Sequence, residues 1–357
     1  MVLLYRRHLD YGQYIKAIRD RQSSIPMISR VMDRFLILMS IIVAALLNAC
    51  VSSSDNTYTL ADALEDNTAI SIPMRITESG LIVLEGTRID GQKLDMVMDT
   101  GATQSAIFQT TLRRLNLGLT SESNTLVHGM TQSKFHEVVK IPQFEIGALK
   151  FLEKPMVVLD DRESTFRKTN RFDGLIGMDI LSNYQIYISP SINELRLIPN
   201  QRKVDVPSFW PRIFLKENPF QPDGRNLHFM DIRVAGQITH SLFDTGAEFS
   251  VMNWKAARYS QVRHIRRKLR EEWELQGAIG VFRPTANIKL ENIRSGQVFW
   301  ENKSFIVLDF TRLDILGIED KPFIIAGMNL FKGESFFMDF DRNFIALIPE
   351  SNLDNLH

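Results

Sequence analysis

The chain is poor in the features that would place it among disulfide-bonded, metal-binding or nucleic-acid-binding proteins. Its one cysteine, Cys50, excludes a disulfide framework and a cysteine-rich metal site. Its 42 basic residues equal its 42 acidic residues, so we expect no nucleic-acid partner. Seven scattered histidines argue against zinc. HExxH, GxSxG, Walker and helix-preceding GxGxxG motifs are also absent, so neither a metal nor an organic cofactor is predicted.

Long hydrophobic runs are scarce, and one of them has the form of a signal peptide. Residues 35–47 are apolar, follow Arg30 and Arg34, and are too short for a comfortable membrane-spanning helix. The run ends in Leu47-Asn48-Ala49-Cys50, which resembles the lipobox of bacterial lipoproteins. In that family, cleavage leaves a lipid-modified cysteine as the first residue. The alternative is a buried cysteine at the end of a core helix.

The lipobox resemblance implies that Cys50 is a lipid attachment site. The mature chain would then be lipid-anchored to a bacterial membrane on its extracytoplasmic, periplasmic face, and Val51 resembles a signal for outer-membrane delivery. Several acyl chains hold a protein stably where one does not. We therefore assign residues 1–49 to an N-terminal extension and signal peptide and residues 50–69 to a tether, which begins small and polar.

The rest of the chain contains an internal repeat. Its two copies are offset by 145 residues at the start and by 149 or 150 residues later. The matching segments are 91–102 with 236–247, 157–160 with 306–309, 175–179 with 325–329, and 197–199 with 347–349. The chain is therefore expected to fold as two similar halves that differ by a few loop residues.

Each half reads as a mainly β unit. Short apolar or alternating runs are bounded by glycine and Asp-Gly turns, a pattern closer to a barrel than to a βαβ sheet. Prolines concentrate between the halves, so we place the boundary near residue 205. This gives one lobe at 70–204 and a second at 205–357. A charged helix is expected at 254–275, either as a solvated face or as a binding patch.

The strongest chemical signal is a duplicated Asp-Thr-Gly-Ala. Asp99-Thr100-Gly101-Ala102 and Asp244-Thr245-Gly246-Ala247 each follow an apolar run. Leu175-Ile176-Gly177 and Ile325-Ala326-Gly327 come some 80 residues later. Over residues 70–350 these motifs resemble retropepsin-like aspartic peptidases. The resemblance implies two retropepsin-like β-barrel lobes in an intramolecular pseudo-dimer, with Asp99 and Asp244 catalytic.

Physical chemistry gives a reason for these residue types. Two carboxyl groups held close together cannot both ionise, so one keeps a proton while the other acts as a base. Gly101 and Gly246 allow the tight turns that bring N–H groups toward each carboxylate. By the resemblance, Thr100 and Thr245 hydrogen-bond across the pseudo-twofold axis. For a single aspartate the alternative is a turn residue that caps its own backbone.

Two flaps are expected between each loop and the later glycine element, because an extended peptide needs a cover that excludes water. Gly129 and Gly277 lie at the matching places. The prediction is a monomeric aspartic endopeptidase that cleaves extended polypeptides. Two alternatives remain: a noncatalytic peptide-binding lipoprotein, to which Glu248 beside the second loop points, and two half-domains that each need a second chain.

Overall fold

The chain is mostly β-strand in the part that the computed structural model describes, so the predicted mainly β fold is confirmed. That part is residues 58–356 without 67, 119–120, 130–132, 161–171, 221–225, 260–274, 277–280, 309, 311–315 and 319. The predicted signal peptide and Cys50 lie outside it. No helix among the described residues is long and apolar enough to cross a membrane.

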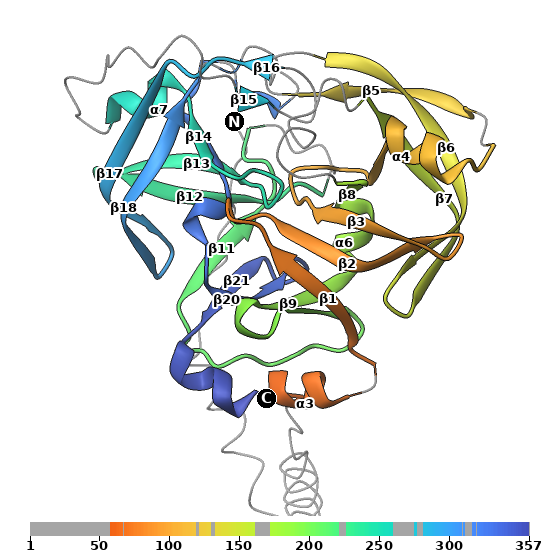
Figure 1. Cartoon of the computed structure of the whole chain (residues 1–357). Helices are drawn as coiled ribbons and strands as arrows, with labels where there is room; N and C mark the ends of the chain where they lie inside the picture. The colour runs from red at the N-terminus through yellow and green to blue at the C-terminus, as the bar shows by residue number, and fades with distance from the viewer. Residues whose placement is uncertain are drawn as a thin grey trace, which may run out of the picture. The chain divides into compact units, whose positions relative to one another are not determined.

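The first lobe is a closed barrel in which six described strands pair in a ring (Figure 1). In order around the ring they are β2 (Ile82–Ile89), β3 (Gln92–Met98), β8 (Gly174–Ile176), β4 (Ala106–Phe108), β7 (Leu149–Leu159) and β6 (Ser133–Ile146). The short strand β8 lies parallel to β3 and antiparallel to β4. It therefore separates two strands that are close neighbours in the sequence. Helix α4 (Gln109–Leu115) follows β4, and α6 (Met178–Leu181) follows β8.

The second lobe repeats this ring strand for strand. Its order is β12 (Phe229–Val234), β13 (Gln237–Phe243), β19 (Phe323–Ala326), β14 (Ser250–Met252), β18 (Val298–Val307) and β17 (Ala286–Ser295). A 3₁₀ helix, Met328–Leu330, stands where α6 stands in the first lobe. The charged helix expected at 254–275 begins as α7 (Trp254–Tyr259), and its remainder falls largely outside the described residues.

A six-stranded antiparallel sheet joins the two lobes. Its order is β1 (Ile70–Ile76), β10 (Glu194–Pro199), β9 (Tyr184–Ser189), β20 (Ser335–Asp339), β21 (Phe344–Ile348) and β11 (Arg212–Lys216). The lobes meet where β9 pairs with β20. Strand β1 also pairs with β2, and β11 also pairs with β12, so the sheet is continuous with both barrels.

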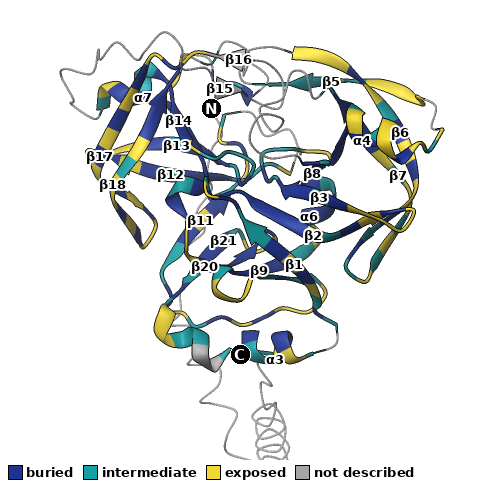
Figure 2. Ribbon diagram, viewed as in Figure 1, coloured by how far each residue is buried: buried dark blue, intermediate teal, exposed yellow. Residues whose placement is uncertain are grey.

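Buried apolar side chains fill both barrels and the space around the joining sheet (Figure 2). Helix α3 (Leu60–Glu65) contributes Leu60, Ala63 and Leu64 to the cluster that includes Trp210 and Phe337. This helix lies within residues 50–69, which the sequence assigned to the tether. Its apolar face makes the end of that segment part of the folded unit, because burying three apolar side chains favours docking over a free linker.

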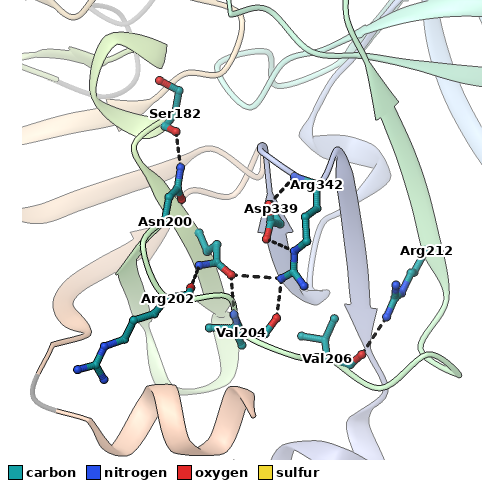
Figure 3. A network of polar contacts seen from close by, with 9 residues as sticks. Ser182, Asn200, Arg202, Val204, Val206, Arg212, Asp339 and Arg342 are labelled. Carbon is teal, nitrogen blue, oxygen red and sulfur yellow. Dashed lines mark hydrogen bonds and ion pairs between the residues drawn. The ribbon is translucent and has the colours of Figure 1, made fainter. Parts of the chain in front are cut away.

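The connection between the lobes is held by the joining sheet. Arg342, in the turn between β20 and β21, donates to the carbonyl oxygen of Val204 and pairs with the buried carboxylate of Asp339 at 2.6 Å (Figure 3). Asn200 donates to Ser182 at the other end of the connection. The predicted boundary at residue 205 falls in this anchored segment, between β10 and β11.

Candidate active site

The two Asp-Thr-Gly loops begin where a central strand of each barrel ends. Asp99 follows β3 and donates its N–H to Ile176 on β8 at 2.9 Å. Asp244 follows β13 and donates its N–H to Ala326 on β19 at 3.1 Å. In each lobe this hydrogen bond extends the parallel pairing, of β3 with β8 and of β13 with β19, by one residue. It therefore fixes the backbone direction at the aspartate, just before the chain turns.

Each loop's glycine faces the carboxyl group of the other loop. A Cβ atom at Gly101 would lie 2.6 Å from Cγ of Asp244, and one at Gly246 would lie 2.5 Å from Cγ of Asp99. Within each loop, the glycine N–H donates to the aspartate's own Oδ1 at 2.9 Å. Glycine is therefore required at both positions by the close approach of the opposite carboxyl group.

The two threonines cross-link the loops beneath the carboxyl groups. The hydroxyl of Thr100 donates to the carbonyl oxygen of Phe243 at 2.9 Å and accepts from the N–H of Thr245 at 3.0 Å. The hydroxyl of Thr245 donates to Met98 at 2.8 Å and accepts from the N–H of Thr100 at 3.1 Å. Both threonines are fully buried, so these four bonds are shielded from water and hold the two loops in one arrangement.

The carboxyl pair has the electrostatics of a shared-proton site. Burial raises the pKa of Asp99 well above its usual range, and the charge of Asp244 raises it further. Burial also raises the pKa of Asp244, while the N–H groups of Gly246 and Ala247 and a hydrogen bond from Asp99 oppose the rise. Both residues retain partial solvent access. Two carboxyl groups coupled in this way lose their protons in two steps, and both pKa values belong to the pair.

A second layer of polar residues supports each loop, and the sequence reasoning missed it. Ser105 donates its hydroxyl to Asp179 at 2.7 Å and accepts from the N–H of Gly177 at 3.1 Å. Ser250 makes the equivalent bonds, at 2.7 Å to Asn329 and at 3.0 Å from the N–H of Gly327. The signal was available, because both serines stand six residues after their aspartate in the repeat.

The support differs in charge between the two lobes. Asp179 forms an ion pair with Lys154 at 2.6 Å, and both side chains are mostly buried. Asn329 is neutral and donates its side-chain amide to Ser304 at 2.9 Å. The equivalent lysine, Lys303, instead donates to the backbone carbonyl of Asn329 at 3.1 Å. The first loop therefore rests on a charged pair and the second on amide hydrogen bonds.

The two flap candidates differ in how much of each is described. Gly129 directly follows β5 (Ser123–His128), which forms a hairpin with β6, so it lies at a hairpin tip. Gly277 lies outside the described residues, between the short paired strands β15 (Leu275–Gln276) and β16 (Val281–Phe282). The first candidate therefore belongs to the β5–β6 hairpin, which follows β4 and α4 in the chain.

No group of three or more histidine, cysteine or acidic residues that could hold a metal ion occurs in the described part of the chain. The carboxyl groups of Asp99 and Asp244 each accept a hydrogen bond from the backbone N–H of the glycine in their own loop. Such donors stabilise a carboxylate directly. Proton transfer is the chemistry that this pair of carboxyl groups supports.

Comparison with known proteins finds one family similarity, in the first lobe. Residues 86–180, a segment that includes Asp99, match a family model described as aspartyl protease. A crystal structure of conglutin gamma, a basic 7S globulin from lupine seeds, is similar at 10% identity with a TM-score of 0.47, covering 82% of this chain and 97% of that one. No curated protein matches the sequence.

Proposed function

We propose that this chain, whose residues 86–180 match a family model described as aspartyl protease, is an aspartic endopeptidase with Asp99 and Asp244 as its catalytic pair. The observation that carries the proposal is the reciprocal approach of each loop glycine to the opposite carboxyl group. The family match covers the first loop alone. The second loop's equivalent hydrogen bonds support a two-aspartate site.

The proposed mechanism uses the pair in its singly protonated state. The ionised carboxylate takes a proton from water while the water oxygen bonds to the peptide carbonyl carbon. The protonated carboxyl donates its proton to the carbonyl oxygen. The carboxyl that took the proton from water then donates it to the amide nitrogen, and the C–N bond breaks. One hydroxyl of the tetrahedral species gives its proton to the other carboxylate, so the pair again holds one proton. The threonine cross-links would hold the two loops, and with them the carboxyl groups of Asp99 and Asp244, in place throughout the reaction.

Extended polypeptides are the proposed substrates. The hairpin formed by β5 and β6 offers backbone groups that could bind a peptide in β fashion. A peptide-library digest with an Asp99→Asn control tests this proposal. The rival reading is a noncatalytic peptide-binding protein. A statine-type transition-state mimic separates the two, because an intact pair should bind it far more tightly than a matched substrate-like peptide. Equal binding of the mimic and the peptide would favour the noncatalytic peptide-binding protein.

We also propose that one chain is the active unit. Two half-sites in the same polypeptide, joined by the pairing of β9 with β20, support this view over half-domains that each need a second chain. The proposal requires activity per chain to be independent of concentration. A specific activity that falls on dilution in step with a loss of mass would contradict it.

The pH optimum is expected to be mildly acidic to neutral. Both pKa values of the pair are raised, chiefly by burial, so both limbs of the pH profile should lie at higher pH than those of a solvated pair. Pepsin-like enzymes commonly carry serine or threonine where this chain has Ala102 and Ala247. A hydroxyl that donates to an ionised carboxylate lowers its pKa, so Ala102→Ser should move the profile of kcat/KM toward acid.

The control for the pH measurement is Glu248→Gln, because an ionised carboxylate beside the pair would act in the same upward direction. The residue adjoins the second loop and is partly exposed. A wild-type maximum below about pH 4, near the ordinary pKa of a carboxyl group, would contradict the expectation. So would an unchanged profile in both Ala102→Ser and Ala247→Thr.

Attachment to a membrane through Cys50 remains a proposal from the sequence. Cys50→Ser should block lipid addition and leave the precursor unprocessed by the lipoprotein signal peptidase. Metabolic labelling with a fatty acid, read alongside the mass of the chain, measures both effects. Equal labelling of the variant and the wild type would exclude this residue as the anchor. The proposed location is the periplasmic face of a bacterial membrane.

A further inference from the structure

A row of exposed side chains crosses four adjacent strands of the second lobe. Ile238 on β13 is paired with Arg233 on β12, which is paired with Arg294 on β17, which is paired with Phe299 on β18. Paired residues of antiparallel strands share a face of the sheet. Ile238 is 47% exposed and Phe299 is 66% exposed. We call these four residues the lobe 2 row; it lies on the outer face of the barrel, close to two hairpin turns.

The first lobe contains the same row with different side chains. The equivalent positions are Lys93, Arg88, Glu145 and Lys150, paired in the same order across β3, β2, β6 and β7. Glu145 lies between two cations and forms an ion pair with Lys150 at 3.4 Å. All four side chains are polar. This lobe 1 row is therefore an ordinary solvated surface with internal charge pairing.

The second lobe has lost this acidic residue and gained two apolar residues. Arg233 and Arg294 stand directly opposite each other, an arrangement that destabilises an isolated sheet. Arg294 donates to Gly296 at 2.7 Å and stacks over Phe299 at 4.7 Å from the ring centroid. Arg233 reaches only the carbonyl oxygen of Gly236, at 3.4 Å. Among the described residues, neither guanidinium forms an ion pair with a carboxylate.

The surroundings do not supply the missing acid. In the neighbouring row, the carboxylate of Asp231 is engaged by Lys216 at 2.5 Å and by His240 at 2.6 Å. Glu301, in the row on the other side of the lobe 2 row, is exposed and is paired in register with Asn292. Beyond the lobe 2 row the hairpin turns are uncharged. Strands β17 and β18 show their exposed stretches in Figure 2.

We infer that the lobe 2 row is a docking surface for an anionic phospholipid membrane. Two arginines that form no ion pair with a carboxylate suit lipid phosphates, because a guanidinium binds phosphate through two donors. An aliphatic and an aromatic side chain beside them suit the apolar boundary just below the headgroups. The position close to two hairpin turns lets the row approach a surface without moving the barrel. This inference does not depend on catalysis by the aspartate pair.

The test uses site-specific labels in the full chain. Cys50→Ser removes the natural cysteine, and Phe299→Cys or the matched Lys150→Cys then gives one attachment point for an environment-sensitive fluorophore. Vesicles of phosphatidylcholine alone are compared with vesicles that also contain phosphatidylglycerol. The label at position 299 should shift to an apolar emission with the anionic vesicles, and the label at position 150 should not. Salt at about 0.5 M should reverse the shift.

Variants then identify the groups responsible. In the chain labelled at 299, the double variant Arg233→Gln with Arg294→Gln should bind the anionic vesicles about thirtyfold more weakly. This follows because each basic residue contributes about one kcal/mol to the attraction. The control, Arg88→Gln with Lys93→Gln, removes two cations from the lobe 1 row and should leave the response unchanged. Circular dichroism checks that both variants fold. Equal shifts at 299 and 150, equal shifts with neutral vesicles, or self-association in place of vesicle binding would overturn the inference.

Discussion

Replacing either Asp99 or Asp244 with asparagine is expected to lower peptide cleavage by at least about a thousandfold. An amide can neither take the proton from water nor donate one as the protonated carboxyl does, so each substitution removes one of the two roles that the pair divides. The comparison is kcat/KM on one peptide for the wild type and both variants. Retention of more than a few per cent of the activity would contradict the single shared site. About half of the wild-type activity in each variant would mean that the two lobes act separately.

Stability provides the control for those variants. A carboxyl group whose pKa is raised by folding contributes stability that is fully present below the unfolded pKa and is lost as pH rises through the folded value. The pKa of Asp99 is raised by burial and by Asp244, so its ionisation opposes folding near neutral pH. Asp99→Asn should therefore unfold at the same or a higher temperature than the wild type at neutral pH. The difference in unfolding temperature between the variant and the wild type should become smaller as the pH falls. An inactive and destabilised variant would indicate disruption of the fold.

The sequence was sufficient to predict the loops because the repeat made two weak motifs into one strong signal. A single Asp-Thr-Gly is uninformative, but the copies at Asp99 and Asp244 fall after matching strands, β3 and β13. Alternating apolar residues also predicted most barrel strands, since one face of each is buried. The fold class followed from local patterns that the two lobes share.

The sequence could not predict the joining sheet or the second layer beneath the loops. Strand β11 lies in the proline-rich connection and owes its existence to pairing with β21 and β12, far along the chain. The hydrogen bond from Ser105 to Asp179 likewise spans two elements that only the barrel brings together. Local propensity carries no information on such partners. The second lobe has Asn329 where the first has Asp179, and the structure explains this difference by the ion pair between Asp179 and Lys154.

Substituting alanine for a loop glycine tests the close approach on which the proposed site depends. In Gly246→Ala the new methyl group would lie 2.5 Å from Cγ of Asp99, and in Gly101→Ala it would lie 2.6 Å from Cγ of Asp244. Side-chain carbon atoms cannot approach this closely, so the facing carboxyl must swing away or the loops must separate. A displacement of about 1 Å costs roughly a hundredfold in rate, and we expect at least that loss of kcat/KM.

Gly86→Ala is the matched control, because its new methyl group would meet Ile72 and Pro73 at 3.3 Å and no site residue. It should keep near wild-type activity. The pH profile separates displaced carboxyls from a damaged fold: when the two groups move apart, Asp244 no longer raises the pKa of Asp99, so the basic limb should move toward acid. Activity within about threefold of the wild type in both loop variants would show that the glycines do not hold the carboxyl groups together. An unchanged profile with a lower melting temperature would assign the loss of activity to folding.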